Sequence, residues 1–145
     1  MKGESGVKIL SLALLVVGLC LISQDGFCES YTEQSIGNFD YVSGSDGYSG
    51  TGQQVGNFYY FNDTQGNSYT TQNIGDFAYT SGSNGYSGVS NQIGNFGYTN
   101  DNSGGNYTSQ SIGNFDYVSG SDGYNGTGQQ IGNFYHYSDN NSDNE

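Results

Sequence analysis

From residue 29 onward the sequence contains no lysine, arginine, leucine, methionine, tryptophan, proline or cysteine, and its only alanine is Ala78. Because the strongest helix formers are almost all missing, this part of the chain is not expected to form helices. The lack of cysteine excludes the disulfide framework that small secreted domains often use. The formal net charge of −12 excludes binding to nucleic acid through the phosphate backbone, so no nucleic-acid partner is expected.

Reactive side chains are equally scarce. His136 is the single histidine, and it stands where other copies of a repeated unit carry tyrosine, which indicates a structural substitution. Without a second histidine, or a cysteine or lysine after residue 28, the chain cannot build a catalytic triad or a zinc site. The Ser-Asp-Gly segments at Asp46 and Asp122 offer oxygen ligands for a weak calcium site, but a plain turn explains the same residues. We therefore expect no enzymatic activity, no cofactor and no metal site.

The first 28 residues have the features of a targeting segment. Lys2 and Lys8 precede an apolar run at residues 9–22, and Gly26 and Cys28 supply small residues after it. A basic segment, a short apolar helix and small residues at the cleavage site are typical of a secretory signal peptide. The apolar run is shorter than the roughly 20 residues that a membrane-spanning helix needs. We therefore expect residues 1–28 to be cleaved, leaving a secreted, extracellular chain without a stable membrane span.

The remaining chain is one unit repeated six times. A block of Ile/Val-Gly-Asn/Asp-Phe recurs every 19 residues, beginning at Ile36, Val55, Ile74, Ile93, Ile112 and Ile131. A fixed period of this length is the mark of repeat architectures. Odd and even units also continue differently, which gives a superimposed 38-residue period. The sequence thus divides into six repeats at residues 29–137 and an acidic polar tail at residues 138–145.

Each unit has the pattern of a strand, a turn and a strand. Gly-Asn between two segments rich in β-favouring residues predicts a two-residue hairpin turn of type II′, with glycine in the first central position. In the first unit this register pairs Ile36 with Phe39, Gln34 with Tyr41, and Thr32 with Ser43. The predicted turn glycines are Gly37, Gly56, Gly75, Gly94, Gly113 and Gly132.

One face of the hairpin is kept in all six units, and it is predicted to be the inner face. Side chains alternate across a strand, so the kept Thr, Gln, Ile, Phe and Tyr positions share one face while the other face varies. The predicted repeat core comprises Ile36, Phe39, Tyr41, Val55, Phe58, Tyr60, Ile74, Phe77, Tyr79, Ile93, Phe96, Tyr98, Ile112, Phe115, Tyr117, Ile131 and Phe134.

The predicted fold class is therefore all-β, built from tandem 19-residue strand-turn-strand repeats. One hairpin buries too little apolar surface to offset the entropy lost on ordering it. The units must stack as a β-solenoid, join as repeated hairpins, or stay partly disordered. A stacked array would end in open strand edges that can add further chains.

Two resemblances to known families cover the repeats. The Gln, Gly and Asn around a strand-turn-strand unit resemble the curli-type amyloid repeat, which implies stacking into a fibre. The windows with a leading Gln and a closing Tyr resemble core peptides of plant burpitide precursors, which implies that Tyr41, Tyr60, Tyr79 and Tyr117 become cross-linked. These windows are residues 34–41, 53–60, 72–79 and 110–117.

Three functions follow from this reading. The first is a secreted structural protein of an extracellular matrix, cell wall or surface coat, which associates with itself or with the matrix through β-assembly or tyrosine cross-links. The second is a precursor of repeated burpitide-like peptides. The third is an ice- or surface-binding β-solenoid that uses a row of threonines. Asn-x-Ser/Thr sequences mark candidate glycosylation sites at Asn62, Asn106, Asn125 and Asn140.

Overall fold

The computed structural model describes residues 30–45, 47–121 and 123–139, and this part of the chain consists of β-strands joined by short turns. The predicted signal peptide, the end of the acidic tail and Asn140 lie outside these residues. The twelve strands are β1 (Ser30–Ile36), β2 (Phe39–Gly44), β3 (Ser49–Val55), β4 (Phe58–Asp63), β5 (Ser68–Ile74), β6 (Phe77–Gly82), β7 (Ser87–Ile93), β8 (Phe96–Asp101), β9 (Asn106–Ile112), β10 (Phe115–Gly120), β11 (Asn125–Ile131) and β12 (Phe134–Asp139).

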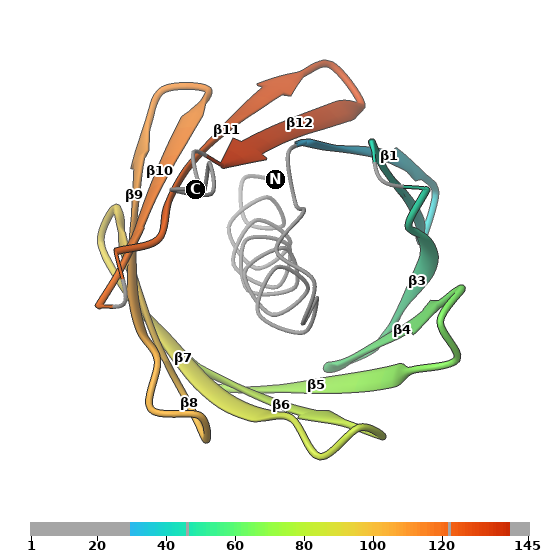
Figure 1. Ribbon diagram of the computed structural model, residues 1–145, viewed down its shortest axis with the longest axis horizontal. Coiled ribbons are helices and arrows are strands. Elements are labelled where there is room, and N and C mark those ends of the chain that lie inside the picture. Colours follow the sequence, from blue (N-terminus) through green and yellow to red (C-terminus); the bar gives the residue numbers. More distant parts are fainter. Residues whose placement is uncertain (1–29, 46, 122, 140–145) are drawn as a thin grey trace, which may run out of the picture.

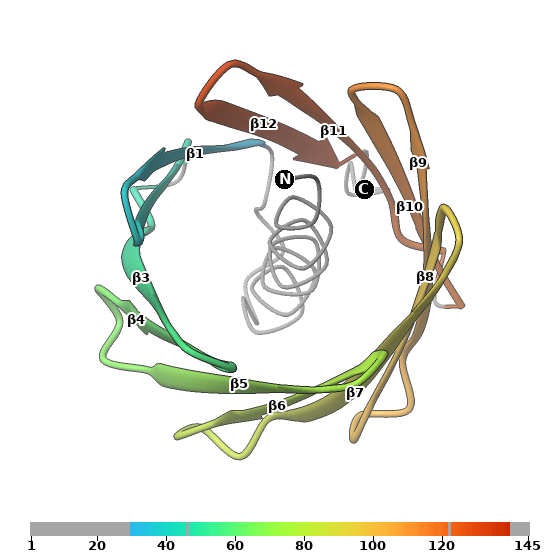
Figure 2. The same ribbon diagram turned by 180° about the vertical axis from the view of Figure 1, so that it is seen from behind.

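The strands form a closed antiparallel barrel in which each strand pairs with the next along the chain. Figures 1 and 2 show the resulting ring, with β1 beside β12. The prediction of an all-β fold made of repeated hairpins is confirmed, although the hairpins close into a barrel rather than stacking as a solenoid. Because β12 pairs with β1, the sheet has no open edge among the described strands, and the predicted template edges are absent.

The predicted hairpin register is confirmed. Ile36 pairs with Phe39, Gln34 with Tyr41, and Thr32 with Ser43. All six predicted turn glycines have a positive φ, between 60° and 66°, whereas no other residue type in the described chain has one. A positive φ at the first central residue alone defines the type II′ turn, whose twist matches that of the flanking strands.

The connections between hairpins lie at the opposite end of the barrel and use a second, three-residue turn. After β4, the Gly66 N–H donates to the Asp63 carbonyl at 3.3 Å, and the Asp63 N–H donates to the Asn67 carbonyl at 3.0 Å. Gly66 has a φ of 87°. This is a type I turn followed by a glycine bulge, the common three-residue hairpin connection. Every connection in the barrel is therefore short, and a glycine turns the chain at each end.

The predicted repeat core does not lie on the inner face, and this prediction is wrong. The side chains concerned are on the exposed face of the barrel, with exposed fractions from 36% for Phe58 to 63% for Ile93. They are Ile36, Phe39, Tyr41, Val55, Phe58, Tyr60, Ile74, Phe77, Tyr79, Ile93, Phe96, Tyr98, Ile112, Phe115, Tyr117, Ile131 and Phe134.

The opposite face, which varies between units, is the buried one. Its apolar members are Tyr31, Val42, Tyr48, Tyr59, Phe61, Tyr69, Ala78, Tyr107, Val118, Tyr124, Tyr135 and Tyr137. The physical reason lies in the geometry of a barrel. Six equivalent hairpins present the same side chains outward, where neighbours do not compete for space. Inside, large and small side chains must complement one another across neighbouring strands, so the inner positions differ from unit to unit.

Candidate functional surfaces

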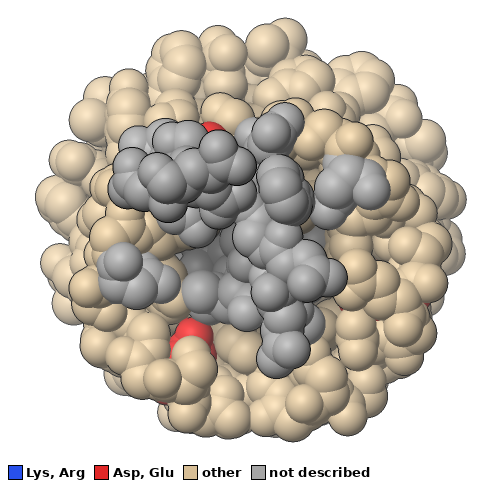
Figure 3. Space-filling model, in the orientation of Figure 1, with Lys and Arg blue, Asp and Glu red and all other residues tan. Residues whose placement is uncertain are grey.

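The outer face of the barrel carries no charged side chain on its strands. Acidic residues within the strands are all buried or half-buried, on the inner face: Glu33, Asp40, Asp63, Asp101, Asp116 and Asp139. The outward positions hold Thr, Val, Gln, Asn, Ile, Phe, Tyr, His and Ser. Figure 3 views one end of the barrel, and little acidic surface of the described residues is visible there. The strand carboxylates are thus turned inward, although charged side chains usually lie on the outside of a folded protein.

An apolar ring surrounds the barrel at the end that carries the Gly-Asn/Asp turns. In each hairpin an Ile or Val pairs with a Phe directly before and after the turn, as Val55 does with Phe58. The exterior ring comprises Ile36, Phe39, Val55, Phe58, Ile74, Phe77, Ile93, Phe96, Ile112, Phe115, Ile131 and Phe134, all of them exposed. Contiguous exposed apolar surface of this kind marks an interaction site.

A layer of aromatic side chains lies next to the exterior ring. Tyr60 stacks beside Phe58 with ring centroids 6.2 Å apart, and Tyr79 lies 6.4 Å from Phe77. The exposed tyrosines of this layer are Tyr41, Tyr60, Tyr79, Tyr98 and Tyr117. His136 takes the sixth place and stacks on Phe134 at 6.3 Å. Its Nδ1 lies 3.1 Å from Thr32 Oγ1, which gives this histidine a structural contact between β12 and β1.

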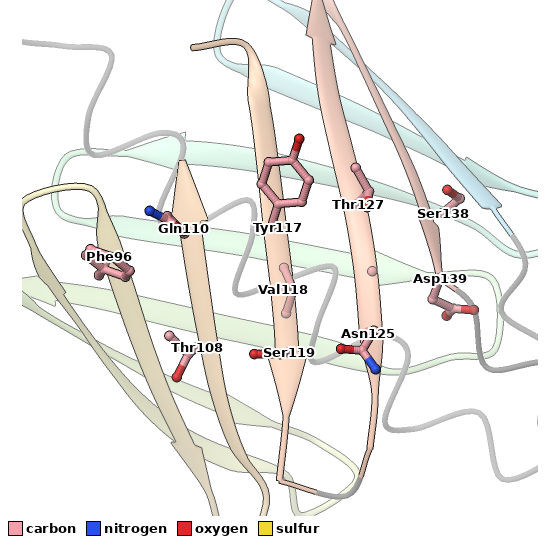
Figure 4. A pocket seen from close by; sticks show the side chains of 11 residues that line it. Phe96, Thr108, Gln110, Tyr117, Val118, Ser119, Asn125, Thr127, Ser138 and Asp139 are labelled. Atoms are coloured by element: carbon pink, nitrogen blue, oxygen red, sulfur yellow. The ribbon is translucent and has the colours of Figure 1, made fainter. Parts of the chain in front are cut away.

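A shallow groove of about 430 Å³ crosses this exterior between β8 and β12. Figure 4 shows its lining side chains, which come from neighbouring strands. Most belong to the outer face and are uncharged, including Phe96, Gln110 and Tyr117, whereas Asp139 reaches the groove from the inner face at the end of β12. The groove therefore offers aromatic surface and neutral hydrogen-bonding groups, as the rest of the exterior does.

On the inner face, the tips of aromatic side chains occupy the space beside glycines of the neighbouring strand. A Cβ added to Gly52 would sit 1.8 Å from Tyr59 Oη, and one added to Gly128 would sit 1.8 Å from Tyr135 Oη. Gly50 is covered in the same way by the ring of Phe61. Only glycine leaves room for a ring at these positions, so the glycines and rings form matched pairs across β3–β4 and β11–β12.

We expect Gly52→Val to lower the free energy of unfolding by about 1–3 kcal/mol, because the new side chain would displace the Tyr59 ring from the inner face. Urea unfolding measures the change. Gln53→Val is the matched control, because it places the same side chain one residue away on the exposed face of β3. Equal losses in the two variants would show that Tyr59 does not lie over Gly52.

Carboxylates and tyrosines meet on the inner face where β1 joins β2 and β12. Glu33 is only 3% exposed. Burial, together with the nearby Asp40 carboxyl, raises the pKa of Glu33 to about 8. Asp40 accepts a hydrogen bond from Ser35 Oγ at 2.6 Å, and the equivalent Asp116 accepts one from Ser111 Oγ at 2.5 Å. This cluster is the most strongly perturbed group of titratable side chains in the described chain.

The two tyrosines beside these carboxylates are perturbed in the same direction. Burial and the charges of Asp40 and Glu33 raise the pKa of the Tyr59 hydroxyl far above its ordinary value. Burial and the charge of Asp116, with smaller contributions from Tyr137 and Glu33, do the same for Tyr135. Both hydroxyls are therefore protonated at any physiological pH.

A second tyrosine cluster lies toward the three-residue turns. Edge-to-face pairs join Tyr31 with Tyr48 and Tyr107 with Tyr124, at centroid distances of 5.9 and 6.1 Å. The hydroxyl oxygens of Tyr124 and Tyr137 lie 2.5 Å apart. Sequence reasoning missed these contacts because the pattern assigned the burial to the other face. The signal was present in the 38-residue period, which places the same tyrosines in units one and five.

The candidate glycosylation asparagines within the described residues are all accessible. Asn62, Asn106 and Asn125 are exposed at strand ends near the three-residue turns. The Asn125 side-chain amide donates to the Gly123 carbonyl at 2.8 Å, and Asn62 Oδ1 accepts from Ser68 Oγ at 2.7 Å. These contacts stabilise the turns, as asparagine commonly does, and the glycosylation itself stays a prediction.

Comparisons with known proteins name no relative. No protein-family model matches the chain, and neither the curated proteins nor the solved structures contain a match. Within the described ranges, no group of three or more His, Cys, Asp or Glu side chains could hold a metal ion. The same residues include no helix with the length and hydropathy required to span a membrane.

Proposed function

We propose that the protein is a secreted structural component of an extracellular matrix, cell wall or surface coat, and that it associates through its uncharged aromatic exterior. The observation that carries the proposal is the inward placement of the strand carboxylates together with the exposed exterior ring. A polyanion normally repels its own copies. Here the surface that would meet a copy is uncharged and apolar, so its burial against another copy is favourable.

The closed barrel favours tyrosine cross-linking over fibre growth by strand addition. Every strand edge is paired, because β1 and β12 join the two ends of the sheet. The five outward tyrosines are between 41% and 47% exposed, which leaves their rings open to a partner. In such a cross-link two phenols each lose one hydrogen atom, a carbon–carbon bond forms between their rings, and one hydrogen peroxide is reduced to two waters by a peroxidase.

We expect the purified secreted chain, treated with peroxidase and hydrogen peroxide, to form covalent oligomers with dityrosine fluorescence. A variant with Phe at the five outward tyrosines should lose most of this signal while keeping its fold, because the changes are on the surface. The outward set is Tyr41, Tyr60, Tyr79, Tyr98 and Tyr117. The other nine of the 14 tyrosines remain in that variant and serve as an internal control. Undiminished cross-linking would contradict a role for the outward set.

The mass of the secreted product distinguishes a peptide precursor from a structural protein. Each predicted core peptide spans a Gly-Asn/Asp turn, as residues 34–41 do at the turn between β1 and β2. Release of such a core would cut the barrel open. An intact secreted chain supports the structural proposal, whereas short products beginning at Gln34, Gln53, Gln72 or Gln110 would replace it.

The ice-binding reading gains no support from the geometry. The threonines of the repeated row are Thr32, Thr51, Thr70, Thr108 and Thr127, and each lies on a different odd-numbered strand. In a closed barrel the outer faces of these strands are turned in different directions around the ring. The threonines therefore do not share the flat plane that an ice surface requires.

A further inference from the structure

We propose that the exterior groove between β8 and β12 binds a neutral, linear polysaccharide. This inference rests on the proposed function and deepens it, because it names a partner within the matrix or wall to which the protein would belong. It follows from the register of the strands that line the groove, from the order of aromatic and hydrogen-bonding side chains along it, and from the lack of charge on the outward strand positions.

A continuous row of outward side chains crosses the groove from β8 to β12. Phe96 lies opposite Gln110, and Gln110 lies opposite Tyr117 on its other side. The row continues from Tyr117 to Thr127 and from Thr127 to Ser138. All of these residues line the groove, and Figure 4 shows them in this order from left to right. Because neighbouring strands lie about 4.8 Å apart, the row is roughly 19 Å long.

A second row of hydrogen-bonding side chains runs beside the first. Thr108 lies opposite Ser119, and Ser119 lies opposite Asn125 on β11. These residues also line the groove. Both rows run across the strands rather than along one of them, so they extend the site in one direction. Such a site suits a linear chain better than a compact molecule.

Two aromatic rings and an amide form the first half of the row. Phe96 is 39% exposed and Tyr117 is 47% exposed, and Gln110 lies half-buried between them. The backbone positions of the two aromatic residues are two strands apart, about 10 Å, which is close to the length of a disaccharide in an extended polysaccharide. A sugar ring has an apolar face of C–H groups that packs on an aromatic ring. Its hydroxyls can donate to and accept from the Gln110 amide.

Beyond Tyr117 the row consists of hydroxyl groups. Thr127 and Ser138 are exposed and uncharged. Each hydroxyl can donate one hydrogen bond and accept others, as the hydroxyls of a sugar can. Sites for small molecules combine apolar surface with a few placed polar groups, in volumes of about 300–1,000 Å³. The groove, with a volume of about 430 Å³, has both properties.

The chemistry of the groove favours a neutral polysaccharide over other linear molecules. The formal net charge of −12 repels acidic polysaccharides. An extended peptide usually adds to a free strand edge, whereas every described strand is paired on both sides. A lipid chain would leave the amide and the hydroxyls of the row without hydrogen-bond partners.

Isothermal titration calorimetry of the secreted chain tests the proposal. The neutral probes are cellohexaose, xylohexaose and mannohexaose, and the acidic comparison is hexagalacturonate. We expect saturable binding of at least one neutral probe and no binding of the acidic one. Tyr117→Ala should weaken the binding about fivefold or more, because it removes one of the two rings of the row. Gln110→Leu should also weaken it, because leucine offers no hydrogen bond to a sugar hydroxyl.

Tyr79→Ala is the matched control for Tyr117→Ala. Tyr79 is the equivalent residue of another hairpin, is 45% exposed and does not line the groove. In its row Val89 takes the place of the hydroxyl residue Thr127. We expect Tyr79→Ala to leave the affinity within about twofold of wild type, because the change is on the surface and outside the groove.

Phenylalanine variants separate this inference from the cross-linking proposal. Tyr117→Phe keeps the aromatic ring, so we expect it to bind the neutral probe within about threefold of wild type. The variant with Phe at all five outward tyrosines should likewise bind the probe while losing its dityrosine signal. Binding without any dityrosine in the wild-type chain would overturn the cross-linking alone. Cross-linking without binding would overturn the polysaccharide partner alone.

The remaining outcomes each contradict one part of the inference. Equal weakening by Tyr117→Ala and Tyr79→Ala would show general contact with the aromatic layer and overturn the groove as the site. Hexagalacturonate that binds as tightly as the neutral probes would overturn a neutral ligand. The absence of binding by every neutral probe would overturn the proposal, and a loss of self-association in Tyr117→Ala on sedimentation would then make the groove an interface between copies. Circular dichroism of each variant establishes that it is folded before it is titrated.

Discussion

Replacement of Phe61 by alanine is expected to lower the free energy of unfolding by about 3–5 kcal/mol. Phe61 is 0% exposed and lies over Gly50, next to the ring of Tyr69 at a centroid distance of 6.3 Å. Its removal would leave a cavity beside a glycine, which has no side chain to fill it. Urea or thermal unfolding of the purified chain measures the loss, with the two-state assumption checked by two probes.

The same strand supplies the matched control. Phe58 is three residues earlier on β4 and 36% exposed on the outer face. Phe58→Ala removes the same atoms, and we expect a loss of less than about 1 kcal/mol. Comparison of the stability losses of Phe61→Ala and Phe58→Ala tests which face of the sheet is inside. A larger loss for Phe58→Ala would restore the inner face that the sequence pattern predicts and would contradict the barrel described here.

This test addresses the point at which sequence reasoning failed. The period of two separated the faces correctly, and the Gly-Asn turn fixed the register, because both signals are local. Neither signal says which face is inside when both carry apolar side chains. Constancy among the repeats does not indicate burial here, because Ile36 and its equivalents each occupy the same exposed environment around a ring.

The inner face shows why the variable positions are the buried ones. At one pair of equivalent inward positions, each hairpin places a different pair of residues opposite one another, and the pairs complement one another in size. The pairs are Glu33 with Val42, Gly52 with Phe61, Thr71 with Thr80, Ser90 with Thr99, Ser109 with Val118, and Gly128 with Tyr137. Glycine faces an aromatic ring twice, and hydroxyl faces hydroxyl twice. This covariation of size was visible in the sequence and could have identified the inner face.

The carboxylate cluster could not be predicted from the sequence. Glu33 and Tyr135 are 102 residues apart in the sequence and are neighbours only because β1 pairs with β12. Nothing in a 19-residue unit says how many hairpins close a ring or that a ring closes at all. The repeats specify the local hairpin, and the closure depends on how the twist and stagger of all twelve strands add together.

Glu33 also gives the chain a predictable dependence on pH. Its pKa is about 8 in the folded state against 4.5 for the ordinary side chain. The folded state therefore binds this proton more tightly than the unfolded state does. The resulting contribution to stability is complete below about pH 4.5, falls as the pH rises through the interval to about 8, and is absent above it. At about 1.4 kcal/mol for each tenfold change in acidity, the full fall is up to about 5 kcal/mol.

We expect the wild-type free energy of unfolding to decline between pH 5 and pH 8 by several kcal/mol more than that of Glu33→Gln, because glutamine cannot ionise on the inner face. Urea unfolding at a series of pH values measures both curves. Asp76→Asn should keep the wild-type decline, since it changes the net charge equally but lies in an exposed turn. Parallel curves for wild type and Glu33→Gln would mean that the Glu33 carboxyl is hydrated, and would remove the physical basis for a buried acid at the β1–β12 junction.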